Sequence, residues 1–241
     1  MNNNVGPRPT PVGSRPADLP DPEQSLVLSY LDLRKAVGII GVSLPFVLVL
    51  GDWLLQALRG ASASSPVFEP SISCYVYSRM GRVFVGSLCA IGVFLLSTRG
   101  YDKRDEIAGR LASVFAVCVA LFPTSPCPGA DALHALISKF HWTCAALLFV
   151  TLAYFCLKLF TETSPDRPPT RQKLQRNLVY KVCGYIILVS ILAIGLDKLV
   201  PTVGSLLDRL NPVFWLESIA VVAFGVAWLT KGEAILKDEQ V

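Results

Sequence analysis

The chain has 241 residues, of which 52% are hydrophobic and 17% are charged, and its mean hydropathy is +0.51. Soluble domains carry about 25% charged residues, so this composition excludes a soluble enzyme, a disordered protein, a coiled coil and a nucleic-acid reader. A membrane-spanning helix needs roughly 20 apolar residues, and half of this chain is enough for about six of them. The composition therefore predicts a polytopic membrane protein.

Residues 1–30 are polar and rich in proline, and no apolar period runs through them. We interpret them as a disordered cytoplasmic tail. The apolar stretch of a cleavable signal peptide is missing there, so the first apolar run is expected to stay in the protein as a membrane helix. Residues 31–235 are then the transmembrane domain, and residues 236–241 are a short second cytoplasmic tail.

Hydrophobic segments follow the tail, separated by charges or by proline and glycine. They are 36–57, 81–98, 107–123, 141–160, 181–200 and 213–230. A spanning α-helix satisfies its own backbone hydrogen bonds in lipid, whereas a membrane β-barrel needs short alternating segments. The pattern predicts an all-α bundle of six transmembrane helices.

Basic residues orient such a bundle, because cytoplasmic loops carry an excess of Lys and Arg. With the N-terminus inside, 16 of the 22 Lys and Arg residues fall on the cytoplasmic side. The sequence therefore predicts that both termini are cytoplasmic and that loops 58–80, 124–140 and 201–212 are outside. The inner loop 161–180 is basic and proline-rich, which fits a topology signal or contact with anionic lipid heads.

Small residues predict how two of the helices pack. Four alanines in the third segment are spaced by four and share one helix face: Ala108, Ala112, Ala116 and Ala120. Gly86 and Ala90 form a similar pair in the second segment, so we expect segments two and three to be a tight hairpin. Pro45 lies inside the first segment and should kink it.

Ionisable residues inside spans are costly and point to functional sites. Four of them lie near the outer ends of different segments: Asp52, His141, Asp197 and Glu217. The outer loops add further polar groups, among them Glu69, Ser71, Ser73, Tyr75, Tyr77, Arg79, Asp131 and His134. These groups either converge on an outward-facing cavity or reach water and helix ends separately, with Lys198 pairing a neighbouring acid.

The functional interpretation assigns roles to eight of these residues. The candidate catalytic residues are His141, Glu217 and Ser73, and the candidate ligand-binding residues are Asp52, Asp197, Arg79, Arg82 and Tyr75. Glu217 is the strongest candidate, because it begins the last span beside Trp215 and an ionised carboxylate at that depth needs a partner. The expected partners are His141 and either Arg79 or Arg82.

Metal and cofactor signals are missing from the sequence. Its only two histidines are His134 and His141, and it has no HExxH, HxxxH or CxxC pattern, P-loop or dinucleotide fingerprint. We therefore expect no metal and no cofactor. Cys74 and Cys127 both fall in outer loops, on the oxidising side, and could form a disulfide.

Three stretches, SISCYVYSRMGRVFVG (71–86), STRGYDKRDEIAGRLASVFAVCVALFPTSP (97–126) and FWLESIAVVAFGVAWLTKGE (214–233), resemble a family of uncharacterised six-span bacterial membrane proteins. This resemblance implies a helical bundle in the bacterial cytoplasmic membrane. A more distant resemblance is to the ceramidase and adiponectin-receptor superfamily of membrane hydrolases, which place Ser, Asp and His around zinc. Ser73, Asp102 and His141 are the corresponding candidates by order.

The sequence predicts an integral membrane protein that binds lipid or a small molecule, or acts as an accessory subunit, at the outer leaflet. The alternatives are a membrane-embedded hydrolase with a polar site near the outer face, and a transporter or channel. Membrane lipids are the expected partners, and nucleic acid is not. The sequence leaves open whether a second copy of the chain or another membrane subunit also binds.

Overall fold

The computed structural model describes residues 22–58, 68–97, 103–124, 132–163, 169–199 and 210–236. Helix accounts for 87% of these residues, and they contain no strand, so the predicted all-α class is confirmed. The long helices are α1 (Pro22–Leu58), α2 (Gly81–Ser97), α3 (Lys103–Leu121), α4 (Ala132–Tyr154), α5 (Arg171–Leu199) and α7 (Pro212–Lys231). A short 3₁₀ helix, Ser73–Tyr77, precedes α2, and a π-helix, Phe155–Leu159, continues α4.

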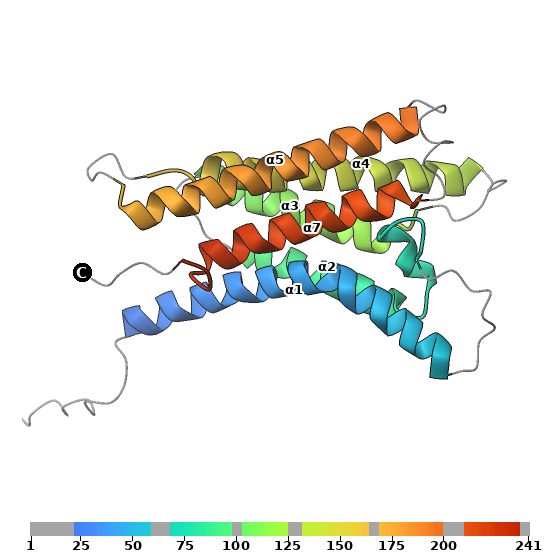
Figure 1. The fold of residues 1–241 in the computed structure, drawn as a ribbon, viewed down its shortest axis with the longest axis horizontal. Helices are drawn as coiled ribbons and strands as arrows, with labels where there is room; N and C mark the ends of the chain where they lie inside the picture. Colours follow the sequence, from blue (N-terminus) through green and yellow to red (C-terminus); the bar gives the residue numbers. More distant parts are fainter. Residues whose placement is uncertain are drawn as a thin grey trace, which may run out of the picture.

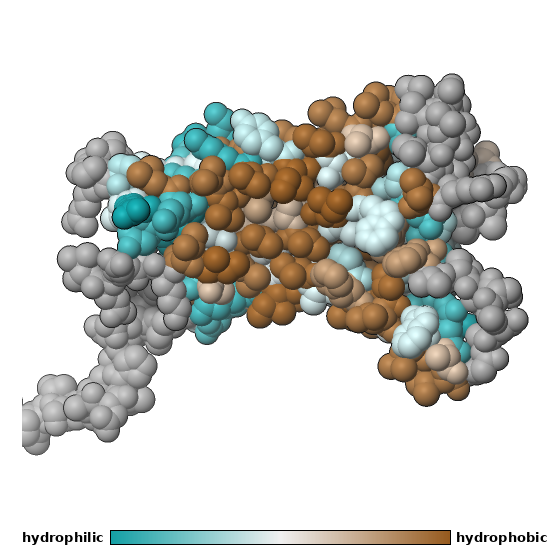
Figure 2. All heavy atoms as spheres, viewed as in Figure 1, coloured by the Kyte–Doolittle hydropathy of each residue, from teal (hydrophilic) through white to brown (hydrophobic). Residues whose placement is uncertain are grey.

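Each predicted apolar segment lies on one of these long helices. Four stretches are long and apolar enough to cross a membrane: Ser29–Leu58, Ala132–Leu159, Arg171–Leu199 and Pro212–Lys231. Helix α2 is apolar as well but has 17 residues. Hydrophobic side chains cover the middle of the visible face, and hydrophilic ones gather at the end where α1 begins (Figure 2). These features are those of a multi-pass membrane protein.

The helices lie side by side and form a closed ring. Consecutive helices contact one another from α1 through α5, α5 contacts α7, and α7 returns to α1. Figure 1 shows α1, α3 and α5 running in one direction and α2, α4 and α7 in the other. It also shows a bend in the middle of α1, the helix that contains Pro45. A proline there removes a backbone hydrogen bond and crowds the preceding turn.

The alanine stripe of α3 faces the protein, as predicted. Ala108, Ala112, Ala116 and Ala120 are all buried, and α3 packs against α2. The predicted contact at Gly86 is wrong, because Gly86 is exposed and a Cβ there would meet no atom within 4 Å. The close approach is at Gly92, where a Cβ would lie 3.3 Å from the carbonyl oxygen of Ser113.

Three helices begin nine or more residues before the apolar segments predicted for them. Helix α1 begins at Pro22, so the expected tail boundary at residue 30 is wrong, and residues 22–30 are helical. Proline is favoured in the first turn because its missing N–H has no partner there in any case. Helix α4 begins at Ala132 and so includes His134, and α5 begins at Arg171. Polar ends of spanning helices are stable beyond the apolar core, where hydropathy no longer marks them.

Glycines set the contact between α1 and α7, which brings the first and last helices together. A Cβ on Gly225 would lie 2.5 Å from the backbone nitrogen of Val42 and 2.8 Å from the carbonyl oxygen of Gly38. A Cβ on Gly41 would lie 3.1 Å from the Cα of Gly225. The two backbones therefore touch directly, as small residues allow in membrane bundles.

We expect Gly225→Ala to destabilise the bundle by about 1–3 kcal/mol, because the added methyl group meets backbone atoms that cannot move independently. The matched control is Gly195→Ala in α5, where a Cβ would meet no atom within 4 Å. Alanine is the better helix former by about 1 kcal/mol, so the control should be neutral or stabilising. Thermal unfolding in detergent measures both, and equal midpoints would contradict a close α1–α7 crossing.

Candidate functional site

The segment of residues 68–80, between α1 and α2, covers the end of the bundle where α7 begins (Figure 1). Aromatic contacts hold it against α7: the ring centroids of Phe68 lie 5.2 Å from Phe214 and 5.4 Å from Trp215. The ring of Tyr75 lies 6.3 Å from Phe214. The N–H groups of Cys74, Tyr75 and Ser78 donate to carbonyl oxygens inside the segment. The N–H groups ahead of these turns need partners elsewhere in the protein.

Glu217 supplies one set of these partners. Its Oε2 accepts the backbone N–H of Ile72 at 2.7 Å and that of Ser73 at 3.4 Å, at the start of the 3₁₀ helix. The Glu217 side chain is buried, with 4% of the residue exposed. Backbone N–H groups at a helix start favour a negative group. The expected pairing of Glu217 with His141 or an arginine is therefore wrong, because backbone groups take the place of those side chains.

Asp52 anchors the other end of the segment. Its Oδ1 accepts the backbone N–H of Arg79 at 3.2 Å and lies 3.7 Å from the guanidinium Nη1 of the same residue. Gln56, one turn along α1, donates to Asp52 Oδ2 at 2.5 Å. Asp52 and Glu217 thus anchor the 68–80 segment from two different helices.

Further contacts and burial hold this segment against the bundle. Tyr77 donates its hydroxyl hydrogen to the carbonyl oxygen of Thr124 at 2.6 Å, which fixes the segment to the chain that follows α3. Burial raises the pKa of Tyr75 to about 12, so its hydroxyl stays protonated at neutral pH. Burial and then the Asp52 carboxylate raise the pKa of Glu69. The segment is packed into the bundle and does not lie loosely over it.

The polar contacts of His141 and Asp197 do not involve the 68–80 segment. The Nδ1 of His141 donates to the carbonyl oxygen of Phe122 at 2.6 Å, which joins α4 to the end of α3. Asp197 pairs with Lys198 at 3.3 Å, as expected for an interfacial acid beside a lysine. Within the described ranges, His141 Nε2 and Asp197 Oδ1 are buried without a hydrogen-bond partner. Each is an acceptor or donor site for a water or a ligand.

A small cavity lies inside the bundle, below the 68–80 segment. Its volume is about 50 Å³, enough for a water molecule but not for a lipid. Ser73 and Glu217 are the polar residues of its wall, and apolar side chains of α1, α2, α3, α4 and α7 form the rest. The structure thus brings two candidate catalytic residues together but does not add His141 to the same wall.

A larger open groove of about 800 Å³ lies between the last turn of α1 and the start of α2. We call it the arginine groove, because Arg79 and Arg82 line it beside Ser78. Its remaining wall is apolar or small: Leu55, Val76, Gly81, Val85 and Gly86. This groove therefore combines two guanidinium groups with an apolar surface that a hydrocarbon chain could contact.

A third groove, of about 710 Å³, lies between α1, α5 and α7. Its wall is almost wholly apolar, and the hydroxyl of its one serine, Ser218, already donates to the carbonyl oxygen of Phe214. This groove can contact acyl chains but cannot recognise a polar group. Across the described residues, no group of three or more His, Cys, Asp and Glu side chains could hold a metal ion.

Some sequence-based candidates lie outside the described residues: Asp102, Cys127 and Asp131. The Cys74–Cys127 disulfide and the Ser73–Asp102–His141 set therefore stay predictions. Gln56 and the Phe122 carbonyl oxygen were missed, although the spacing of Gln56 four residues after Asp52 is a visible signal. The chain was compared with protein-family models, with curated proteins and with solved structures, and none of them matched.

The anchoring contacts predict different effects for two substitutions of Glu217. Glu217→Gln keeps an oxygen that can accept the Ile72 N–H, whereas Glu217→Leu leaves that buried donor without a partner at a cost of about 1–3 kcal/mol. We therefore expect faster hydrogen exchange at the Ile72 and Ser73 amides in Glu217→Leu than in Glu217→Gln. Glu106→Leu, on the exposed surface of α3, is the control and should leave these amides unchanged. Wild-type exchange in Glu217→Leu would contradict the anchoring role.

Proposed function

We propose that all six long helices cross the bacterial cytoplasmic membrane, with both termini in the cytoplasm. The bacterial location rests on the resemblance of three sequence stretches to six-span bacterial membrane proteins. The antiparallel ring supports an even number of crossings, because its first and last helices have their chain-terminal ends on the same side. The distribution of Lys and Arg supports the orientation.

Helix α2 is the shortest of the six, and a helix of 17 residues is about 25 Å long. That is slightly less than the hydrocarbon thickness of about 30 Å. Its pairing with α3 explains how it can still cross, because the buried alanine stripe lets the two helices share one contact face. Local thinning of the bilayer at α2 and α3 accommodates the remaining difference.

Cysteine labelling tests this topology. We expect an engineered cysteine at a position within 62–65 to react with a membrane-impermeant thiol reagent in intact cells. A cysteine within 165–175 should react only after the membrane is opened, because that loop is cytoplasmic in our assignment. Each variant is made in a background without the native cysteines. Labelling of the second site but not the first in intact cells would reverse the orientation.

We propose further that the protein binds an anionic phospholipid at the outer leaflet, in the arginine groove. The observation that carries this proposal is the position of Arg79 and Arg82 beside an apolar wall at the end of the bundle. Guanidinium groups bind phosphate oxygens through paired hydrogen bonds. Gly86 supports the fit, because no atom lies within 4 Å of where its Cβ would be, which leaves room beside α2 for a hydrocarbon chain.

The groups in the groove favour lipid binding over the other two functions. A hydrolase needs a nucleophile next to a base, and the hydrogen bond from Ser73 to Glu217 comes from the backbone nitrogen of Ser73. A transporter needs acids along a pathway near the midplane, whereas Asp52 and Glu217 bind the backbone of the 68–80 segment. A lipid site needs only a basic end and an apolar wall, and the groove has both.

Lipid binding to Arg82→Gln tests the proposal. We expect the variant to bind phosphatidylglycerol about tenfold more weakly than the wild type, because it loses a charge-assisted hydrogen bond worth about 1.5–3 kcal/mol. Native mass spectrometry of the detergent-solubilised protein measures the bound lipid. The control is Lys139→Gln, which removes one exposed positive charge from the same end of the bundle. Equal binding by both variants and the wild type would refute the arginine groove as the site.

A further inference from the structure

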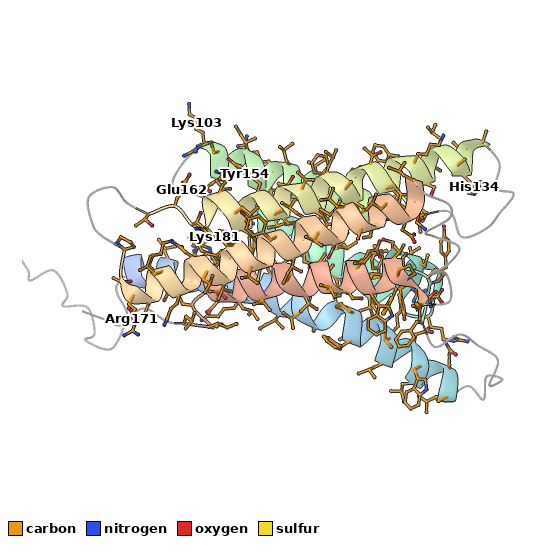
Figure 3. The ribbon with its side chains drawn as sticks, turned by 45° about the horizontal axis from the view of Figure 1, so that its top comes forward. Lys103, His134, Tyr154, Glu162, Arg171 and Lys181 are labelled. Atoms are coloured by element: carbon orange, nitrogen blue, oxygen red, sulfur yellow. The ribbon has the colours of Figure 1, made fainter. Side chains whose placement is uncertain are left out.

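The opposite end of the bundle, which is cytoplasmic in our assignment, gathers cations around the last turn of α7. Lys103, Arg171 and Lys181 lie at this end, far from His134 (Figure 3). The innermost of the basic residues come from three helices, and we call them the cation cluster: Arg34 of α1, Lys173 and Arg176 of α5, and Lys231 of α7. Arg34, Lys173 and Arg176 all lie within electrostatic range of the Lys231 ammonium group.

Two members of the cation cluster, Lys173 and Lys231, contact Phe160. The π-helix Phe155–Leu159 leads directly into this residue, whose N–H donates to the carbonyl oxygen of Phe155 at 2.9 Å. The Lys231 Nζ lies 5.3 Å from the centroid of the Phe160 ring, and the Lys173 Nζ donates to the Phe160 carbonyl oxygen at 2.9 Å.

Other contacts fix the surroundings of this ring. Phe160 is buried and lies 4.8 Å from Trp228 and 5.3 Å from Tyr180, measured between ring centroids. A Cβ on Gly232, just after α7, would lie 3.0 Å from the backbone nitrogen of Lys35, so the end of α7 touches α1 beside Arg34. The cations are therefore held by packed aromatic rings and backbone, and not by loose loops.

Two carboxylates of the described residues act on members of the cation cluster. Glu233 lies 3.8 Å from Arg176, and Asp105 lies within electrostatic range of Lys231. The carboxyl end of α7 adds a partial negative charge of about one half. Three other described acids at this end form surface pairs with cations outside the cluster, in Arg104–Glu162, Arg110–Glu106 and Lys35–Asp32. Lys231 therefore lies among three other cations, and within the described residues Asp105 is the carboxylate whose charge opposes theirs at its ammonium group.

Lys231 is the member best placed to contact a ligand. Its side chain is partly buried, and apart from the Phe160 ring no hydrogen-bonding partner of its ammonium group is found in the described residues. An ammonium group carries three donors, and an aromatic ring satisfies none of them fully. Placing it among three further cations is costly unless an anion shares the site.

We propose that the cation cluster binds a phosphate group. Arginine donates paired hydrogen bonds to phosphate oxygens, and lysine adds a point charge, so the two residue types together suit this anion. The group belongs either to the head of an anionic phospholipid in the cytoplasmic leaflet or to a soluble phosphate compound. This site lies at the other end of the molecule from the arginine groove and does not depend on it.

Thermal unfolding of the detergent-solubilised full chain tests the proposal with two probes, inorganic phosphate and mixed micelles that contain phosphatidic acid. Phosphatidylcholine micelles and chloride at equal ionic strength give the baselines. We expect at least one probe to raise the unfolding midpoint of the wild type, because a ligand that binds the folded state stabilises it. Lys231→Gln should need about tenfold more of that probe for the same shift.

The controls separate a binding site from general charge effects. Lys181→Gln removes an exposed charge at the same end and should respond like the wild type. Because we propose that the arginine groove also binds an anionic phospholipid, the micelle titrations are repeated in an Arg82→Gln background. In that background, a remaining loss in Lys231→Gln belongs to the cation cluster. Arg34→Gln is the second test variant and should also need more of the probe. If Lys231→Gln does not fold, the response of Arg34→Gln tests whether the cation cluster binds the probe.

The result also identifies the source of the phosphate group. A shift with phosphatidic acid alone assigns the site to a lipid head, and a shift with inorganic phosphate as well assigns it to a soluble ligand. The proposal is overturned if neither probe shifts the wild type. An unchanged response in Lys231→Gln, or in Arg34→Gln where Lys231→Gln does not fold, overturns it as well. An equal loss in Lys181→Gln would do the same, because the effect would then be one of net charge.

Discussion

Hydrogen bonds from the backbone of residues 68–80 to Asp52 and Glu217 are the contacts on which the end of the bundle where α7 begins depends. Buried backbone N–H groups have to find partners within the protein, because water does not reach them. Glu217 accepts the N–H groups of Ile72 and Ser73, and Asp52 accepts that of Arg79. With both ends of the segment anchored, its short 3₁₀ helix closes the bundle.

The position of the arginine groove follows from the same contacts. Asp52 accepts the backbone N–H of Arg79 and lies 3.7 Å from its guanidinium group, and Arg82 follows three residues later in the first turn of α2. The backbone that carries both arginines is therefore fixed relative to α1. The two acids that anchor the 68–80 segment therefore also determine where the arginine groove lies. They show how carboxylates can be buried in this bundle, since the groups they bind are backbone donors.

The contact between α1 and α7 closes the helix ring, and this one pair of helices carries polar groups at both ends of the bundle. Backbone contact of Gly38 and Gly41 with Gly225 brings α1 against α7 over the middle of the bundle. The same pair of helices then carries Asp52 and Glu217 at one end, and Arg34 and Lys231 at the other. One close helix crossing therefore positions polar groups on both sides of an apolar middle, and each side meets a different chemical environment.

The sequence alone predicted the features that depend on composition and on the spacing of residues along one helix. Long apolar stretches predicted helices, because a helix satisfies its own backbone whatever surrounds it, and each of the six stretches lies on one helix. The alanine spacing in α3 correctly indicated a buried face. The acids Asp52 and Glu217 were marked as needing partners, since a carboxylate at that depth is costly in any fold.

Only the tertiary structure decided what those partners are. Glu217 and Ile72 are 145 residues apart, and a backbone N–H carries no signal in a sequence, so the expected partners were side chains. The same reason applies to Gly92 and Gly225, whose importance comes from the atoms of another helix and not from their neighbours in the chain. Helix boundaries at Pro22, Ala132 and Arg171 were also missed, because polar helix ends have no hydropathy signal. Local chemistry thus determined the elements, and long-range packing determined which of their groups meet.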